Sequence, residues 1–283
     1  HKPSRFHFNW LSGRIEMMNT FQILTSFKNP KIQFVRDLIK DRAAREENGL
    51  FIVEGVRLAE EASRLGILPR SVFFCSHLSG RGLELIRHYQ GAAVDVTEVK
   101  PDILDRLSDT ETSQGILLVL PQLVMPMPAS TDLVLILDQV RDPGNMGTIL
   151  RSAAAAGAGV LFVAPGSVDP FMPKVVRAGM GAHFHFPILQ ADWTRISEYC
   201  KVKTAPPLQV LLAEAGAGLS MWQADLTQPL ALVIGGEADG PGPHARHLAD
   251  TLVHIPMTGN FESLNAGVAA SLILYEIIRQ RNS

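Results

Sequence analysis

Cysteine is scarce in this sequence, whose 283 residues include only Cys75 and Cys200. The two lie far apart, and neither has the CxxC or Cys/His spacing that holds zinc. The nine histidines form no HExxH motif or comparable cluster. His183 and His185 alternate along an expected strand, and packing or surface roles are the simplest interpretation for both. The sequence therefore predicts no metal site and a protein of a reducing compartment.

A long apolar run and a strong net charge are also missing. The longest apolar run, in the last helix, is shorter than the ~20 residues that span a membrane, and Glu276 interrupts it. Residues 1–18 carry scattered charges and no apolar core of a secretory signal. We expect a cytoplasmic protein with no membrane partner and a disordered leader over residues 1–28. With a net charge of −2, any binding to nucleic acid must come from a local patch.

Two nucleotide-binding fingerprints are absent as well. The sequence contains no GxGxxG after a strand and no GxxxxGK[ST]. A dinucleotide-binding Rossmann site and a P-loop are therefore unsupported.

What the sequence does contain is a regular alternation of strand and helix patterns, which indicates an α/β fold. A first α/β domain is expected over residues 29–120, and PQLVMPMPAST, with three prolines, indicates a linker over 121–130. The second domain, 131–283, opens with the continuous apolar strand DLVLILD, of the type buried on both faces of a sheet. The pattern predicts a mostly parallel sheet with helices on both faces, whose ligands bind beyond the carboxyl ends of the strands.

The first helical segment, which starts at Asn29, is basic. Between positions 28 and 45 six basic residues stand against two acidic ones. Lys31, Arg36 and Lys40 belong to this excess. An RNA-facing patch and an ordinary solvated helix face are equally good interpretations.

Three expected strand ends, at 137–153, 233–242 and 254–265, carry polar or glycine-rich loops. Each has a simple structural interpretation: Asn145 could cap the next helix, the glycines could mark a flexible connection, and Ser263 or Asn265 could cap the last helix. That helix is apolar nearly all round, so we expect it and its first turn to be buried. Its free N–H groups would then need capping or an anionic ligand.

Arg151 is harder to explain as a structural residue. It lies two turns into an otherwise small and apolar helix. A guanidinium in that setting needs an anionic partner, either a carboxylate or a substrate phosphate.

Together these motifs carry a resemblance. DQVRDPGNMGTILRSAAAAG, IGGEADGPG and IPMTGNFESLNAGVAASLILYE are similar, in order and spacing, to the three signature motifs of the SpoU (TrmH-like) ribose 2′-O-methyltransferases of the SPOUT superfamily. NPKIQFVRDL, FIVEG and SQGILLVL resemble the substrate-binding domain of that family's ribosomal RNA members. The resemblance implies S-adenosylmethionine as cofactor, a trefoil knot in the C-terminal domain, an L30e-like N-terminal domain and a homodimer with its active sites near the interface. It also implies large-subunit ribosomal RNA as the substrate.

The resemblance also assigns residues. It implies main-chain contacts to S-adenosylmethionine from Gly235, Ile255 and Leu264, with Met257 beside them. It places Asn145, Arg151, Glu237, Ser263 and Asn265 at the family's functional polar positions. Among these, Arg151 is the best candidate to stabilise negative charge on the ribose oxygen, because its high pKa disfavours a role as a base. The sequence departs from the family at Gly236, where Asn or Ala is common, and at Gly179, where Ser is common.

Other functions remain open at this point. A transfer RNA methyltransferase would share the chemistry, although such members commonly lack the N-terminal α/β domain. A non-catalytic RNA-binding or ribosome-assembly protein could retain the fold, but it would not need Asn145, Arg151, Glu237 and Asn265 together. A small-molecule enzyme with a nucleotide cofactor is disfavoured by the missing glycine fingerprint.

Overall fold

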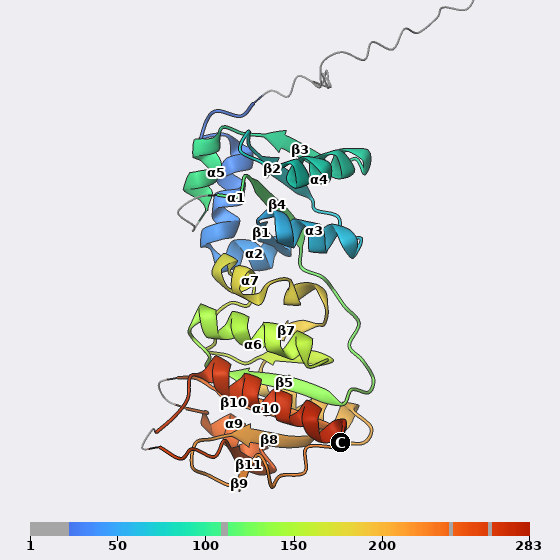
Figure 1. The fold of residues 1–283 in the computed structure, drawn as a ribbon, viewed down its shortest axis with the longest axis vertical. Coiled ribbons are helices and arrows are strands. Elements are labelled where there is room, and N and C mark those ends of the chain that lie inside the picture. Colours follow the sequence, from blue (N-terminus) through green and yellow to red (C-terminus); the bar gives the residue numbers. More distant parts are fainter. Residues whose placement is uncertain (1–22, 109–112, 238–239, 260–261) are drawn as a thin grey trace, which may run out of the picture.

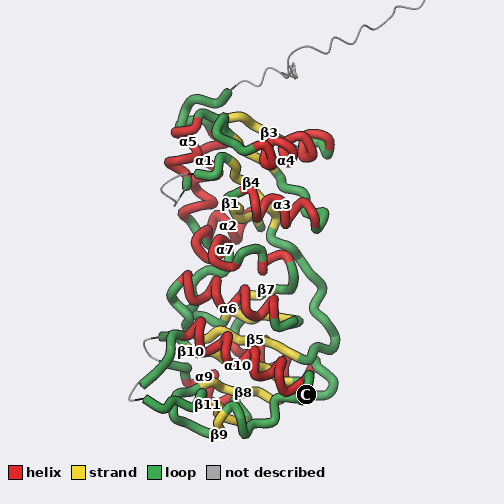
Figure 2. Tube along the Cα trace, in the orientation of Figure 1, coloured by secondary structure: helices red, strands yellow, loops and turns green. Residues whose placement is uncertain are grey.

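Two α/β domains follow one another along the chain, joined by an extended segment that runs down one side of the molecule (Figure 1). The computed structural model describes residues 23–108, 113–237, 240–259 and 262–283. Figure 2 shows that helices and strands alternate through both domains. Within the described residues, no helix is both long and apolar enough to cross a membrane.

The N-terminal domain is built on a four-stranded sheet with the order β1-β4-β2-β3. In this sheet β4 runs antiparallel to both β1 and β2, whereas β2 and β3 are parallel. Its elements are α1 (Pro30–Lys40), α2 (Arg42–Asn48), β1 (Leu50–Glu54), α3 (Val56–Arg64), β2 (Ser71–Phe74), α4 (Gly80–Gly91), β3 (Asp95–Glu98), α5 (Pro101–Leu107) and β4 (Ile116–Pro121). The sequence pattern predicted one helical segment where α1 and α2 lie and predicted the other elements except α5, a short helix that begins at Pro101.

The basic segment forms two helices because Asp41 interrupts it. This residue has an extended backbone, ends α1, and caps α2 by accepting a hydrogen bond from the N–H of Ala43. The buried face of α1 consists of Ile32, Val35 and Leu38, as predicted, while Ile39 is only partly buried.

The expected leader is wrong over its last residues. Leu24 forms a parallel bridge with Val99, and its N–H donates to the carbonyl of Glu98 at 2.9 Å. Phe27 lies under the guanidinium of Arg106, 4.0 Å from its carbon. Residues 24–27 are therefore part of the N-terminal domain, and positions 1–22 of the expected leader lie outside the described residues.

The C-terminal domain is a seven-stranded sheet with the order β7-β6-β5-β10-β8-β11-β9, in which every pair is parallel. The predicted parallel α/β sheet is thereby confirmed. Its elements are β5 (Leu133–Asp138), α6 (Pro143–Ala155), β6 (Val160–Val163), α7 (Pro173–Gly179), β7 (Ile188–Gln190), α8 (Trp193–Glu198), β8 (Gln209–Ala213), β9 (Leu219–Ser220), β10 (Leu230–Gly235), α9 (Pro243–Leu248), β11 (Thr251–His254) and α10 (Ala266–Arg281). The short elements β7, β9 and α9 were not predicted. The trefoil knot stays a prediction of the resemblance.

Alternate residues of each strand face opposite layers of helices. Leu133, Leu135 and Leu137 of β5 pack with α6 and α10 on one face, and Val134 and Ile136 pack with α8 and α9 on the other. Because all strands are parallel, their carboxyl ends share one edge of the sheet. Any site built on those ends must lie along that edge.

The prediction of a fully buried last helix is wrong. In α10, Ala270, Ile273, Leu274 and Ile277 face the core, but Val268, Leu272 and Tyr275 are 47%, 42% and 55% exposed. The residues before the helix, 262–265, are exposed as well. An apolar pattern all round the helix does not distinguish a core helix from one with a second, uncovered apolar face.

His183 and His185 also differ from the expectation, because they lie on and just after a single 3-10 turn over Ala182–Phe184 and not on a strand. The His183 ring is buried between the domains, 6.0 Å from the Phe51 ring and 5.6 Å from the Phe171 ring. Its Nε2 lies 2.7 Å from the carbonyl of Pro170, and its Nδ1 has no hydrogen-bond partner among the described residues. Burial lowers the pKa of this imidazole to about 4.

A buried ion pair also joins the domains. The guanidinium of Arg45 in α2 contacts the carboxylate of Asp169 at 2.7 Å, and both side chains are less than a tenth exposed. Arg45 also donates to the carbonyls of Leu38 and Ile39 at 2.6 and 3.1 Å. With the Phe51, Phe171 and His183 rings beside it, this contact forms a packed interface between the domains.

Candidate active site

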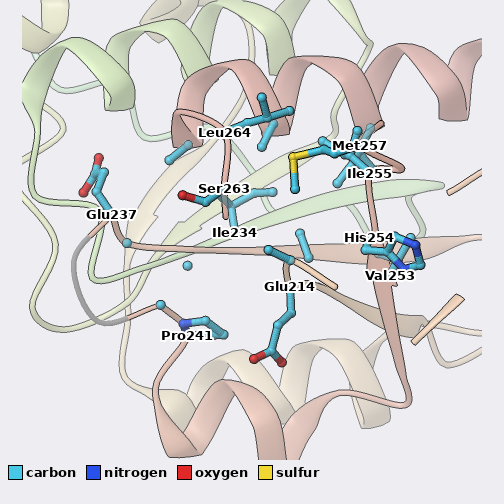
Figure 3. Close-up of a pocket in the computed structure, with 18 of the residues that line it drawn as sticks. Glu214, Ile234, Glu237, Pro241, Val253, His254, Ile255, Met257, Ser263 and Leu264 are labelled. Atoms are coloured by element: carbon cyan, nitrogen blue, oxygen red, sulfur yellow. The ribbon is translucent and has the colours of Figure 1, made fainter. Parts of the chain in front are cut away.

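A cavity of about 350 Å³ opens at the carboxyl ends of β8, β10 and β11. The loop after β11 and the first turns of α10 close it on one side. Figure 3 shows Ile255, Met257 and Leu264 on that side and Glu214 and Pro241 opposite them. The size and the largely apolar wall with a few polar groups are typical of a small-molecule site.

All four predicted cofactor residues line this cavity: Gly235 at the end of β10, Ile255 after β11, and Met257 and Leu264 in the loop that follows. A side chain at position 235 would come within 2.6 Å of the backbone nitrogen of Pro241. Glycine at this position therefore lets the loop after β10 fold back beside the strand end.

Sequence reasoning missed three polar residues in the same wall. Glu214 follows β8 and forms an ion pair with Arg246 of α9 at 2.6 Å. His254, the last residue of β11, contacts the carbonyl of Ala217 through Nδ1 at 3.2 Å. Glu214 and His254 could have been found from the sequence, because each is a polar residue at the end of an apolar strand and the ends of parallel strands meet at one edge of the sheet.

Three predicted polar residues form one hydrogen-bonded chain at the rim of the cavity. The amide of Asn265 donates to the Asn145 side-chain oxygen at 2.8 Å, and the Asn145 amide donates to the Glu237 carboxylate at 2.6 Å. These residues lie in three separate segments, the first turn of α6, the turn after β10 and the N-cap of α10, and the two bonds span 120 and 92 positions of sequence. The folded chain thus brings the three signature segments together.

Of the polar residues that could cap α6 and α10, some do so and others keep their side chains for the cavity. Asp142, and not Asn145, caps α6, because its carboxylate accepts from the N–H of Asn145 at 2.7 Å. Asn265 caps α10 by accepting from the N–H groups of Gly267 and Val268 at 2.9 and 3.2 Å. Ser263 does not cap the helix and instead lines the cavity. The Asn145 side chain is therefore available to hold Glu237.

Arg151 does not lie in the cavity wall. It stands on the exposed face of α6, and no hydrogen bond or ion pair to its side chain is found within the part of the chain that the structure describes. The carboxylate partner that the sequence suggested is thus not among the described residues. The next residue, Ser152, faces α10, because its hydroxyl lies 2.7 Å from that of Ser271.

A buried carboxylate supports the loop between the strand ends. Asp138, at the end of β5, is 1% exposed and accepts from the N–H of Gly242 at 2.6 Å, and burial raises its pKa. The next residue, Gln139, has a left-handed backbone with φ of 58°. A side chain at Gly236 would come within 2.1 Å of the Gln139 carbonyl oxygen. This contact explains the glycine at 236, where the family often has a larger residue.

The second position at which the sequence departs from the family, Gly179, lies at the domain interface. A side chain at Gly179 would approach the His183 ring at 3.1 Å. Glycine here leaves room for the buried imidazole.

The predicted RNA-binding residues of α1 differ in their surroundings. Lys31 forms an exposed ion pair with Asp95 at 2.7 Å, so its charge is partly neutralised. Arg36 has only a 3.5 Å contact with Gln33, and Lys40 is exposed without a side-chain partner among the described residues. The structure also holds no cluster of three or more potential metal ligands in its described segments.

Comparison with known families gives two matches along the chain. Residues 132–275 match the SpoU rRNA Methylase family. Residues 29–118 match the MRM3-like substrate binding domain. The two matches cover both α/β domains in the order in which they occur.

Individual relatives agree with these matches. Human mitochondrial rRNA methyltransferase 3 is 30% identical over 88% of this chain and 72% of its own length. The 23S rRNA (uridine(2479)-2′-O)-methyltransferase of Streptomyces viridochromogenes is 31% identical over 90% of this chain and 92% of its own. The crystal structure of an AdoMet-bound rRNA methyltransferase from Sinorhizobium meliloti superposes with a TM-score of 0.80, with 28% identity over 91% of this chain and 97% of that one.

Proposed function

Because the chain belongs to the SpoU rRNA methylase family, we propose that it transfers a methyl group from S-adenosylmethionine to a ribose 2′-OH of large-subunit ribosomal RNA. The observation that carries the proposal is the cavity whose wall includes Gly235, Ile255, Met257 and Leu264 and whose rim holds the chain of Glu237, Asn145 and Asn265.

The cavity fits the cofactor in size and chemistry. Its apolar wall, with Ile255, Met257 and Leu264, suits the adenine ring and the carbon chain of the cofactor. The Glu214 carboxylate can accept from hydroxyl groups of a bound ribose. S-adenosylmethionine, when bound, would supply a methyl group on a sulfonium cation, which an oxygen nucleophile can attack with a neutral thioether as the leaving group.

The work of the protein is to position the 2′-OH and to stabilise the charge that develops on its oxygen. Holding two reactants in line can lower a barrier by roughly 7–11 kcal/mol. The hydrogen-bonded residues Glu237, Asn145 and Asn265 orient the ribose, and the Glu237 carboxylate is the member of this set that can take up the proton. Arg151 supplies positive charge for the developing alkoxide and for an adjacent phosphate.

Arg151 can serve an active site only if that site extends across the outer face of α6 and α10. We place a second copy of the chain on this face, as a homodimer. The apolar residues Val268, Leu272 and Tyr275 are exposed there, and burying such a surface is the ordinary driving force of subunit association. Tyr275→Arg should then yield monomers by light scattering, whereas Trp222→Arg, an exposed aromatic residue elsewhere, should not.

The N-terminal domain supplies RNA affinity. It matches a substrate-binding domain, and α1 offers the cations Arg36 and Lys40, which form no ion pair with another described residue. Its likeness to the L30e fold stays a prediction. Such phosphate contacts hold the RNA while the base and ribose are recognised elsewhere.

Methyl transfer from radiolabelled S-adenosylmethionine tests the proposal directly. Unmodified large-subunit ribosomal RNA and transfer RNA are offered separately, and the labelled ribose is mapped. We expect label on the ribosomal RNA alone. Label on transfer RNA alone would contradict ribosomal RNA as the substrate. Absence of cofactor binding by isothermal titration would contradict the proposed methyltransferase activity.

A further inference from the structure

A second cavity lies on the same edge of the C-terminal sheet. It has a volume of about 370 Å³ and lies beyond the ends of β5 and β6, where α8 and α9 begin. Its wall includes Asp138, Gln139, Asp192, Trp193, Gly242 and His244. None of the proposed cofactor or catalytic residues belongs to this wall.

Two aromatic rings form one side of this cavity. The indole of Trp193 is partly exposed, and the imidazole of His244 lies nearly parallel to it, with the ring centroids 6.2 Å apart and an angle of 22° between the planes. Trp193 also packs against the core, which limits its motion. A fixed indole with an accessible edge or face is a suitable platform for a flat aromatic ligand.

Two carboxylates also belong to the wall. Asp138 is buried and uses one oxygen for Gly242, and Asp192 uses one oxygen for the N–H of Arg195 at 2.8 Å. The exposed Asp192 carboxylate therefore keeps acceptor capacity for a ligand, whereas the buried Asp138 holds the loop and adds negative charge behind the wall. Two carboxylates repel a phosphate but accept hydrogen bonds from ring and amino N–H groups. This chemistry favours a nucleobase over the phosphate backbone of a nucleic acid.

The position of the cavity agrees with this assignment. Along the sheet edge it lies between the end of β7, where Gln190 accepts a hydrogen bond from Arg42 of the N-terminal domain, and the cofactor cavity. The two cavities share one loop, since Pro241 lines the cofactor cavity and Gly242 the second. RNA held by the N-terminal domain can reach the cofactor cavity across this point.

We propose that this second cavity binds a base of the RNA substrate close to the methylated nucleotide, by stacking on Trp193 and by hydrogen bonds from base N–H groups to Asp192. The inference rests on the proposed function, because it requires RNA as the substrate. It adds a contact that reads a base, whereas the α1 cations contact phosphates.

The test compares two tryptophans. Trp193→Leu keeps an apolar side chain against the core but removes the aromatic plane, and Trp193→Phe restores a plane. Trp222→Leu is the matched control, because Trp222 is 63% exposed and belongs to neither cavity. For each variant one measures kcat and KM for ribosomal RNA, the Kd for S-adenosylmethionine, and binding of a fluorescein-labelled single-stranded RNA fragment of the substrate.

Loss of one stacked base should raise the KM for RNA in Trp193→Leu by about 5- to 150-fold. The Kd for S-adenosylmethionine should stay unchanged, Trp193→Phe should recover most of the affinity, and Trp222→Leu should behave as the unchanged protein. An unchanged KM and RNA affinity in Trp193→Leu, an equal loss in Trp222→Leu, or a parallel loss of cofactor affinity would overturn the proposal. If the unchanged protein methylates no RNA, the proposed function fails, and RNA binding by Trp193→Leu still decides the inference.

Discussion

Removing the carboxylate of Asp169 should destabilise the protein strongly, because it leaves a buried guanidinium without its counter-charge. Arg45 and Asp169 have side chains only 4% and 7% exposed. In Asp169→Ala the Arg45 guanidinium keeps its two carbonyl partners but loses both contacts to the carboxylate. Breaking one side of a buried pair typically lowers the free energy of unfolding by about 3–5 kcal/mol.

Urea unfolding followed by tryptophan fluorescence measures this effect. The matched control is Glu46→Ala, which removes an ion pair with Arg42 whose side chains are 49% and 47% exposed. Exposed pairs contribute only ~0–1 kcal/mol, so this variant should unfold nearly as the unchanged protein does. The double replacement Arg45→Met with Asp169→Leu should recover much of the stability. Equal, small effects of Asp169→Ala and Glu46→Ala would show that the pair does not hold the domains together.

Four further predictions follow from the site and the interface. Arg151→Ala should abolish methyl transfer and leave the Kd for S-adenosylmethionine unchanged; turnover within a few-fold would remove Arg151 from the mechanism. Leu264→Glu should do the reverse and weaken cofactor binding first, which isothermal titration would show, because Leu264 lines the cofactor cavity. Arg36→Glu with Lys40→Glu should weaken RNA binding and flatten its salt dependence, and an unchanged salt slope would make these residues an ordinary solvated face. The pKa of His183 is about 4 when folded and 6.5 in its ordinary state, so the unfolded chain binds the extra proton between these values. Stability should therefore fall by up to ~3 kcal/mol as pH drops from about 6.5 to 4, and a flat urea midpoint over that range, or the same slope in His183→Phe, would contradict this.

The sequence by itself determined the order of the main strands and helices and the parallel type of the C-terminal sheet. DLVLILD and the later apolar runs predicted parallel strands buried on both faces, and the sheet has them. It also identified the three loops at the strand ends, because glycine, proline and polar residues interrupt the apolar pattern there. These features depend on neighbours in sequence, through side-chain period and backbone restriction.

The tertiary structure decided which residue does what within those loops. Asp142 caps α6 and leaves Asn145 to hold Glu237, a choice between two good capping residues that local pattern could not make. The polar wall residue Glu214 and the supporting carboxylate Asp138 became visible only when separate strand ends met.

Tertiary structure also decided which apolar residues are exposed and which polar residues are buried. The pattern of α10 looked apolar on every side, yet Leu272 and Tyr275 lie uncovered, since the sheet can bury only one face of a helix. His183 followed an alternating pattern but is enclosed between Phe51 and Phe171, residues far apart in the chain. Periodicity records which side chains share a face, whereas burial depends on what another segment of the chain, or another chain, places against that face.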